Sequence, residues 1–312
     1  MPATVISVGI VGPGLIGGTL LDQIQAEKPR LLQQRGIDIR VVAIAASKKQ
    51  LFCPEGLAVG ADWKAEWDKA ASPSGLEEFE QFMVGCTNGI VVDCTASPVP
   101  SERYAAWLGK GLHVVTPNKK AGSGPLGFYR ECKAAEGNGG HWMYETTVGA
   151  GLPIIDTLKG LLDTGDKVHK IEGILSGTLS YIFNTFDGTA GFSEVVKGAR
   201  AQVTPPFKDT FPPPPLPPLP RNPTSQSYCL FFSPKGFTEP DPRDDLNGLD
   251  VARKVTILAR ECGLEVELSD VNVESLVAPE LASLKTTEEV RCFAAERSRA
   301  CPHMPELVHP VS

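Results

Sequence analysis

The sequence predicts an α/β fold, with a doubly wound parallel sheet over residues 1–147 and a second, α+β domain over residues 148–290. Short apolar runs rich in β-branched side chains alternate with helical stretches in the first part. This alternation is typical of parallel sheets that carry helices on both faces. A glycine-rich turn joins the first apolar run to the first helical stretch. The 312 residues, 42% of them hydrophobic, suffice for two packed cores.

The elements of the first domain follow from its apolar runs. Strands are predicted at residues 4–11, 38–46, 89–94 and 112–115, because each is a short apolar run with turn or polar residues beside it. The stretch 15–27 between the first two strands is a predicted helix. Strands that alternate with helices in this way favour a doubly wound sheet.

The second domain has fewer clear elements. A strand is predicted at 170–175 and helices at 178–186 and 246–262. The last helix is amphipathic, with Val251, Val255 and Leu258 on one stripe.

A proline-rich segment interrupts this second domain. Residues 212–220 read PPPPLPPLP, and proline removes a backbone donor and fixes φ, so neither a helix nor a central strand can form there. The segment 199–235 is therefore predicted to be an extended, disordered insert. Residues 291–312 have no convincing periodicity and stay an unassigned tail.

The amino-acid composition argues against some classes of binding partner. The formal net charge of −7 argues against nucleic acid and anionic membranes, both of which need a basic surface. The eight cysteines form no C-x-x-C pair and no cysteine/histidine cluster at metal spacing, which favours a reducing compartment. No run of 18 apolar residues occurs, and Met1 passes almost directly into the first strand. A soluble chain acting on small molecules, without a targeting segment, is expected.

The glycine turn is the first candidate site. The sequence GPGLIG at 12–17 follows a predicted strand and opens a predicted helix, and Gly18 adds close packing. In that context glycines let backbone N–H groups and the helix dipole meet a pyrophosphate. We predict a dinucleotide site formed by Gly12, Gly14, Leu15, Ile16 and Gly17, the alternative being a plain tight turn.

The end of the second strand bears on cofactor choice. NAD-selective sites usually have a carboxylate there, which binds the ribose 2′-hydroxyl. Here the sequence reads Ala46-Ser47-Lys48-Lys49, so a 2′-phosphate would meet Ser47 with Lys48 or Lys49. The sequence favours NADP(H), or acceptance of it beside NAD(H). Two merely solvated lysines are the open alternative.

Polar residues end the next two strands. Thr95 follows one of them and Lys119 follows the other. Open α/β sheets bind ligands at the carboxyl ends of their strands, so a lysine there is positioned to meet substrate. By position alone, Lys119 could equally be a surface cation.

Two further segments carry carboxylates. Around Glu145, a run of glycines and small residues could direct carbonyl groups to a ligand or a hard cation, although an interdomain hinge is the favoured interpretation. Near residue 240, a proline-rich acidic loop could hold an ammonium group. Asp250 and Lys254 follow it on one face of a helix beginning near Asn247, at a spacing equally typical of a solvated ion pair.

Taken together, these segments resemble homoserine dehydrogenase, particularly the dehydrogenase portion of plant-type bifunctional aspartate kinase–homoserine dehydrogenases. The resemblance covers about residues 5–198 and 236–290. The segments that carry it are VGPGLIGG at 11–18, HVVTPNKK at 113–120, TVGAGLP at 147–153, SGTLSY at 176–181, and the stretch from Gly236 to Lys254. It implies a Rossmann-type NAD(P)-binding domain and a catalytic and dimerisation domain. It also implies reversible NAD(P)H-dependent reduction of L-aspartate 4-semialdehyde to L-homoserine, in threonine, methionine and isoleucine biosynthesis.

The resemblance also implies roles for single residues. The glycine turn and Thr95 would contact the cofactor, Lys119 would lie between nicotinamide and substrate, and Lys254 would donate the proton. The substrate, chiefly its amino group, would be bound by Glu239, Asp245, Asp250, Gly236 and Thr178. A monovalent cation, usually sodium, would be bound by Glu145 and by the carbonyls of Val148, Ala150 and Leu152. A homodimer in the plastid stroma is expected if the protein is plant-type, and a cytoplasmic one otherwise.

The chain departs from the family pattern in two places. The insert 199–235 separates segments that lie close together in the family, and we interpret it as a retained intron. From about Arg291 the closing part of the family pattern is missing, so the second domain is expected to be incomplete. A catalytically impaired fragment that binds cofactor or pairs with a subunit is one alternative. Aspartate semialdehyde dehydrogenase is another, but it needs a cysteine nucleophile with a histidine partner, and none of the eight cysteines lies in such a context.

Overall fold

A computed structural model describes residues 2–58, 62–70, 72–73, 75–186, 195, 246–275 and 277. The chain divides into two units, one formed by residues 1–169 and 253–271 and the other by 170–252 and 272–312. The division expected from the sequence, at residues 147 and 148, stays a prediction. Within the described part, no helix is both long and apolar enough to cross a bilayer.

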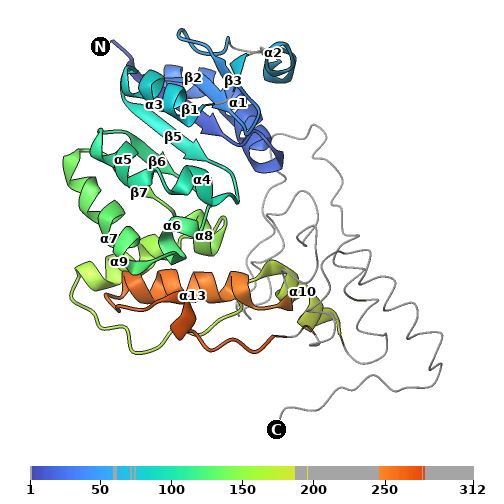
Figure 1. Cartoon of the computed structure of the whole chain (residues 1–312), viewed down its shortest axis with the longest axis vertical. Helices are drawn as coiled ribbons and strands as arrows, with labels where there is room; N and C mark the ends of the chain where they lie inside the picture. The colour runs from blue at the N-terminus through green and yellow to red at the C-terminus, as the bar shows by residue number, and fades with distance from the viewer. Residues whose placement is uncertain are drawn as a thin grey trace, which may run out of the picture. The chain divides into compact units, whose positions relative to one another are not determined.

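The first unit is built on one seven-stranded sheet with the order β4-β3-β2-β1-β5-β6-β7 (Figure 1). The strands β2, β1, β5, β6 and β7 pair in parallel, whereas β3 and β4 add an antiparallel edge. The sheet runs outward in both directions from β1, so the crevice between β1 and β5 is its topological switch point. The strands are β1 Thr4–Val11, β2 Ile37–Ala45, β3 Lys49–Phe52, β4 Ser72–Pro73, β5 Gly89–Asp93, β6 His113–Val115 and β7 Trp142–Met143.

The four strands predicted from the sequence are confirmed as β1, β2, β5 and β6. The first unit also contains nine α-helices between its strands and after them, in the described residues up to 169. These are α1 Leu15–Arg35, α2 Trp63–Lys69, α3 Leu76–Val84, α4 Pro98–Ser101, α5 Tyr104–Gly109, α6 Lys120–Ser123, α7 Leu126–Ala135, α8 Thr146–Gly149 and α9 Ile155–Asp163. Two 3₁₀ helices, η1 Glu136–Asn138 and η2 Leu268–Asp270, and most of the helix α13 Leu249–Glu261 also belong to it.

The helix α1 is longer than predicted. It continues through Pro29 to Arg35 and ends at Gly36, which has a φ of 65° and donates to the carbonyls of Leu31 and Leu32. Proline costs a helix one hydrogen bond but does not always stop it. The expected end near Glu27 is therefore wrong, and a glycine in the left-handed region ends the helix instead.

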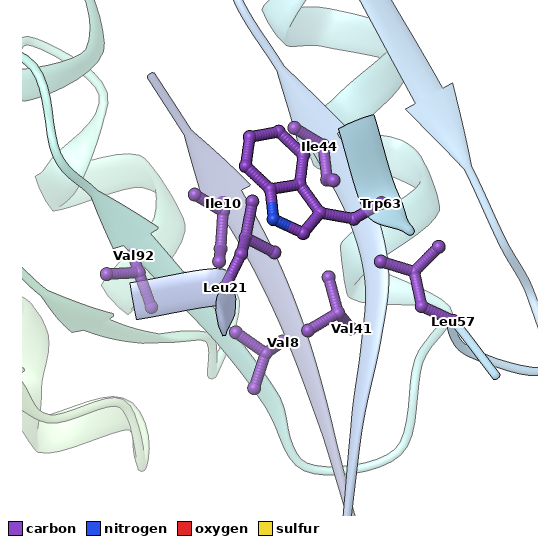
Figure 2. Packing of buried hydrophobic residues seen from close by; sticks show 8 residues of the cluster. All are labelled: Val8, Ile10, Leu21, Val41, Ile44, Leu57, Trp63 and Val92. Atoms are coloured by element: carbon purple, nitrogen blue, oxygen red, sulfur yellow. The ribbon is translucent and has the colours of Figure 1, made fainter. Parts of the chain in front are cut away.

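The core lies on both faces of β1. Val8 and Ile10 on one face pack with Leu21 of α1 and with Trp63 (Figure 2). On the other face, a Cβ at Gly9 would lie only 2.6 Å from the Met83 sulfur of α3, so a residue without a side chain lets this helix approach closely. The indole nitrogen of Trp63 donates to Asp22 at 2.7 Å, which satisfies its one polar atom. The switch point is therefore held rigidly between two helix layers.

The second unit holds α10 Gly177–Thr185 and the beginning of α13 Leu249–Glu261. Both helices were predicted, and Asn247 accepts a hydrogen bond from the Leu249 N–H, as a cap near the expected start of α13. The predicted strand at 170–175 is wrong: these residues are irregular, with Ile171 and Ile174 exposed. The stripe on α13 is also partly wrong, because Val255 is 40% exposed whereas Leu258 is buried. The expected disorder of 199–235 and the tail 291–312 lie outside the described residues.

Candidate functional site

The glycine turn between β1 and α1 has the backbone geometry that its sequence predicts. Gly12 has a φ of 86°, where a side chain would be strained. A Cβ at Gly17 would lie 2.3 Å from the Gly12 carbonyl oxygen, so the helix can begin this close to the turn only with glycine there. Around Gly14, by contrast, a Cβ would meet no atom within 4 Å. The turn is tight on its inner side and open on its outer side.

The open side fits a dinucleotide phosphate. Gly14 is the N-cap residue of α1, makes no side-chain cap, and no acidic residue stands in the first turn. The first N–H groups of this long helix are thus left to a ligand, and the helix dipole favours an anion. Leu15 and Ile16 are more than half exposed beside it. The residues present therefore fit a pyrophosphate bound by backbone N–H groups.

The two lysines after β2 differ in their surroundings. Lys49 donates to the Trp67 carbonyl at 2.6 Å and lies 4.6 Å from the centre of its ring, so its ammonium is already engaged. Ser47 and Lys48 are exposed. Of the two lysines considered from the sequence, Lys48 is the one available to a 2′-phosphate.

A buried network joins the carboxyl ends of β5 and β6. The Asp93 carboxylate is fully buried and accepts from the Thr95 N–H at 2.8 Å, the Tyr104 hydroxyl at 2.6 Å and the Asn118 amide at 3.0 Å. Burial, and then the charge of Asp93, raise the pKa of Tyr104 well above its usual value. The sequence marked the polar strand ends but gave no signal for Tyr104. This network fixes Thr95 and the residue immediately before Lys119.

The network also connects to the glycine turn. The Asn118 amide lies 3.4 Å from the Thr95 hydroxyl oxygen. The methyl group of Thr95 would lie 2.6 Å from a Cβ at Gly12. The structure therefore brings the turn, Thr95 and Asn118, the neighbour of Lys119, together at the switch point. Thr95 and Lys119 follow the carboxyl ends of β5 and β6, as predicted.

Lys119 and Lys254 both belong to the first unit, at the start of α6 and on α13. Lys119 is the N-cap residue of α6, directly after the network. Lys254 lies on α13, in the part that belongs to the first unit. Asp250 stands four residues before Lys254 on the same helix, which gives the two side chains a common face.

Glu145 has a well-defined structural role. Its carboxylate accepts from the backbone N–H groups of Ile154 at 2.6 Å, Ile155 at 2.7 Å and Asp156 at 2.8 Å, and so caps the N-terminus of α9. Nearby, Ala150 has a φ of 48°, a strained value for a residue with a side chain. The Leu152 carbonyl already accepts from the Ile154 N–H at 2.9 Å. In the described ranges, no group of three or more histidine, cysteine, aspartate or glutamate side chains is arranged for a metal ion.

The remaining predicted substrate residues belong to the second unit or to undescribed segments. Thr178 is buried in α10, whose first turn is capped by the Ser176 hydroxyl. Gly236, Glu239 and Asp245 lie outside the described residues.

The cysteines that the structure describes are not activated. Burial raises the pKa of Cys94 to about 11 and that of Cys132 to about 12, with nearby carboxylates adding to both effects. The pKa values of Cys53, Cys86 and Cys262 are also raised, chiefly by burial. A nucleophilic cysteine needs a lowered pKa. These five thiols therefore give no support to acyl-enzyme chemistry.

Comparison with known families gives two matches that together span most of the chain. The NAD-binding domain of homoserine dehydrogenase matches residues 12–145, and the homoserine dehydrogenase domain matches 153–204 and 232–303. The unmatched residues between the last two ranges fall within the predicted insert, and the last match continues beyond Arg291. Whether 199–235 is an insert, and whether the end is truncated, stay predictions.

Single relatives agree with these families. A bifunctional aspartokinase/homoserine dehydrogenase of maize chloroplasts is 45% identical over 92% of this chain, which spans only 28% of that protein. A homoserine dehydrogenase of Schizosaccharomyces pombe is 39% identical over 92% of this chain and 70% of its own length. A crystal structure of a Candida auris protein of unknown function is 34% identical, with a TM-score of 0.71 over 96% of this chain and 75% of the other.

Proposed function

The chain belongs to the homoserine dehydrogenase family, and we propose that it reduces L-aspartate 4-semialdehyde to L-homoserine with NAD(P)H. One observation carries the proposal: the glycine turn, Thr95 and the Asn118–Lys119 segment meet at the sheet's switch point. That crevice is where open α/β sheets bind dinucleotides.

We assign to Lys119 and Lys254 the stabilisation and protonation of the charge that develops on the substrate. When bound, a reduced nicotinamide supplies a hydride to the aldehyde carbon of the substrate. The carbonyl oxygen then becomes a developing alkoxide, which needs a cation or an acid within hydrogen-bond reach. Lys254 donates the proton to this oxygen, and Lys119 stabilises the negative charge from the cofactor side. Neither role requires a cysteine.

Carboxylates are assigned to the substrate's ammonium group. Glu239, Asp245 and Asp250 are its counter-charges, since charge-assisted hydrogen bonds to carboxylates are strong. Gly236 and Thr178 complete the contacts. The position of Asp250 one turn before Lys254 supports this assignment, because it relates an ammonium-binding group to the proton donor by a single helix turn.

A sodium ion is proposed at Glu145 and the carbonyls of Val148, Ala150 and Leu152. The Glu145 carboxylate accepts from three backbone N–H groups at the N-terminus of α9. A cation would therefore bind a carboxylate that is already oriented. No catalytic step depends on it.

The oligomeric state and the cellular location of the protein are proposed from its family. A homodimer through the second domain is proposed, with small molecules as the other partners. The maize relative is named chloroplastic, which supports the plastid stroma for a plant-type protein, with the cytoplasm as the alternative.

A turnover assay tests the function directly. Purified chain is mixed with aspartate semialdehyde and NADPH, and the loss of reduced-cofactor absorbance is followed, with a substrate-free mixture as control. Turnover to homoserine is expected. A chain that binds NADPH but releases no homoserine would support the impaired-fragment alternative.

Lys254→Ala tests the proton donor. It should lower kcat by roughly 10²-fold, the usual scale for loss of a positioned acid. Asp250→Ala should lose part of its activity through a higher KM. Near-normal turnover by Lys254→Ala would transfer the proton-donor role to Lys119.

A further inference from the structure

The helices α6 and α13 meet at Gly122. A Cβ on this buried glycine would lie 3.0 Å from Cγ1 and 3.2 Å from Cδ1 of Ile257, a fully buried side chain of α13. These distances are shorter than ordinary van der Waals contact, so the two helices approach this closely only because residue 122 lacks a side chain.

Arg260 stabilises the contact between α6 and α13 by hydrogen bonds. Its guanidinium is fully buried and donates to the Gly122 carbonyl at 2.8 Å. It also donates to the Val266 carbonyl at 2.9 and 3.0 Å and to the Glu267 carboxylate at 3.1 Å. Glu267 in turn accepts from the Leu126 N–H at 2.9 Å. A buried guanidinium with four hydrogen bonds of this kind fixes both the separation and the rotation of the helices.

The end of α13 has a second anchor. The Glu261 carboxylate is almost fully buried and accepts from the hydroxyl groups of Tyr144 and Tyr129, with the Lys159 ammonium 3.6 Å away. Burial first, and then the Glu261 charge, raise the pKa of Tyr144 far above its usual value. The tyrosines therefore stay donors, and the end of α13 is held against the unit by neutral hydroxyl groups.

Each of the two proposed lysines lies close in sequence to one of the residues that form this contact. Lys119 precedes Gly122 by three residues, and Lys254 precedes Ile257 by three residues. Each is thus about one helical turn, or ~4.5 Å along the helix, from the point where the helices meet. Next to them, burial and the nearby Arg253 lower the pKa of Lys120. Lys120 of α6 and Arg253 of α13, the immediate neighbours of the two lysines, are therefore close enough for their charges to interact.

We propose that Gly122, Ile257 and Arg260 are positioning residues, which set the separation between the reacting groups of Lys119 and Lys254. The inference rests on the proposed function for the roles of the two lysines, but the contact itself does not. A contact that only stabilised the fold would change unfolding and leave kcat per folded molecule alone. A positioning contact changes kcat while cofactor binding is retained, because small misplacements of reacting groups cost up to ~10²-fold.

Gly122→Ala is the main test, with Gly127→Ala as its matched control. Gly127 lies in α7 of the same unit, where a Cβ would meet nothing within 4 Å. We expect Gly122→Ala to lower kcat about 10-fold or more, with the NADPH dissociation constant within about twofold of wild type. Gly127→Ala should match the wild type in both. Full kcat in Gly122→Ala overturns the proposal.

Removal of the opposing side chain should rescue the variant. Gly122→Ala/Ile257→Ala lacks both Ile257 atoms that the new methyl group would meet, so its kcat should exceed that of Gly122→Ala alone. A double variant that is no better contradicts the contact. If Gly122→Ala does not fold, Ile257→Val decides: a kcat at least threefold lower at unchanged NADPH affinity supports the proposal, and wild-type kcat overturns it.

Cross-linking separates this inference from the proposed function. A short amine-reactive cross-linker should join Lys119 to Lys254 in the wild type and do so in lower yield in Gly122→Ala. Lys133 and Lys159, which both lie against the Tyr144 ring, form the control pair and should react equally in both proteins. If wild type lacks turnover but this difference is found, the function fails and the spacing role stands. Equal Lys119–Lys254 yields refute the spacing role, whatever the turnover.

Discussion

At the carboxyl edge of the sheet, the polar groups after β5 and β6 are bonded differently from those after β1 and β2. After β5 and β6, the polar groups bind one another: Asp93, Thr95, Tyr104 and Asn118 form a closed, buried network. After β1 and β2, the polar groups face outward. The first N–H groups of α1 have no side-chain cap, and Ser47 and Lys48 are exposed.

This difference separates two kinds of preorganisation. The network after β5 and β6 is satisfied without a ligand, so it holds the Thr95 and Lys119 backbones in place before binding. The turn after β1 is shaped by glycines but leaves its donors to an anion. We therefore expect substitutions on the first side to change stability, and substitutions on the second side to change cofactor binding.

The largest expected effect is that of Asp93→Ala. It removes the acceptor that the Thr95 N–H, the Tyr104 hydroxyl and the Asn118 amide share, although Tyr104 keeps Thr116 as a partner and Asn118 keeps the Ser97 carbonyl. A buried donor that loses its acceptor costs about 1–3 kcal/mol, so the free energy of unfolding should fall by roughly 2–4 kcal/mol. Urea unfolding followed by tryptophan fluorescence measures it. Asp62→Ala is the control, because Asp62 caps α2 at the surface and its loss should cost only about 1 kcal/mol. Equal losses in the two variants would show that the network is not closed.

The next effect contrasts two glycines of one turn. Gly17→Ala drives a methyl group against the Gly12 carbonyl, so it should lower the melting temperature and weaken NADPH binding at least ~10-fold, about 1.4 kcal/mol. Gly14→Ala meets no protein atom within 4 Å, so it should melt like the wild type and weaken only NADPH binding. Thermal melting and fluorescence titration with NADPH measure both. Wild-type affinity in Gly14→Ala would mean that the pyrophosphate does not lie beside this residue.

The strands β1, β2, β5 and β6 could be predicted, because a strand buried on both faces needs a continuous apolar run, as in β1 and β5. The short strands β3, β4 and β7 were not predicted, since two to four residues carry too little pattern. The failures have a common physical cause, which is dependence on partners elsewhere. The residues 170–175 have strand-like composition, but among the described residues they pair with no other strand, and an isolated strand is not stable. The end of α1 was predicted too early: the helix continues through Pro29 and ends only at Gly36, which lies in the left-handed region.

The same distinction applies to the site. The glycine turn and the polar strand ends are local patterns, and they were predicted. The acceptor role of Asp93 depends on Tyr104 and Asn118, which lie 11 and 25 residues further along the chain. Glu145 caps α9, whose first N–H groups lie nine and ten residues further along the chain. From the residues around Glu145 alone, the sequence suggested only a hinge or a cation ligand. Neither role can be inferred from spacing alone.

The smallest expected effect concerns cofactor choice. NADP(H) should serve at least as well as NAD(H), because no carboxylate follows β2. Lys48→Ala should raise the KM for NADPH about two- to fivefold and leave the KM for NADH unchanged, since an exposed charge pair contributes only up to about 1 kcal/mol. The difference should shrink with added salt, which screens exposed charges. Lys49→Ala is the matched control: its ammonium is held by Trp67, so cofactor preference should persist. If Lys49→Ala changed the preference and Lys48→Ala did not, the phosphate would bind at the β3 side of the loop instead.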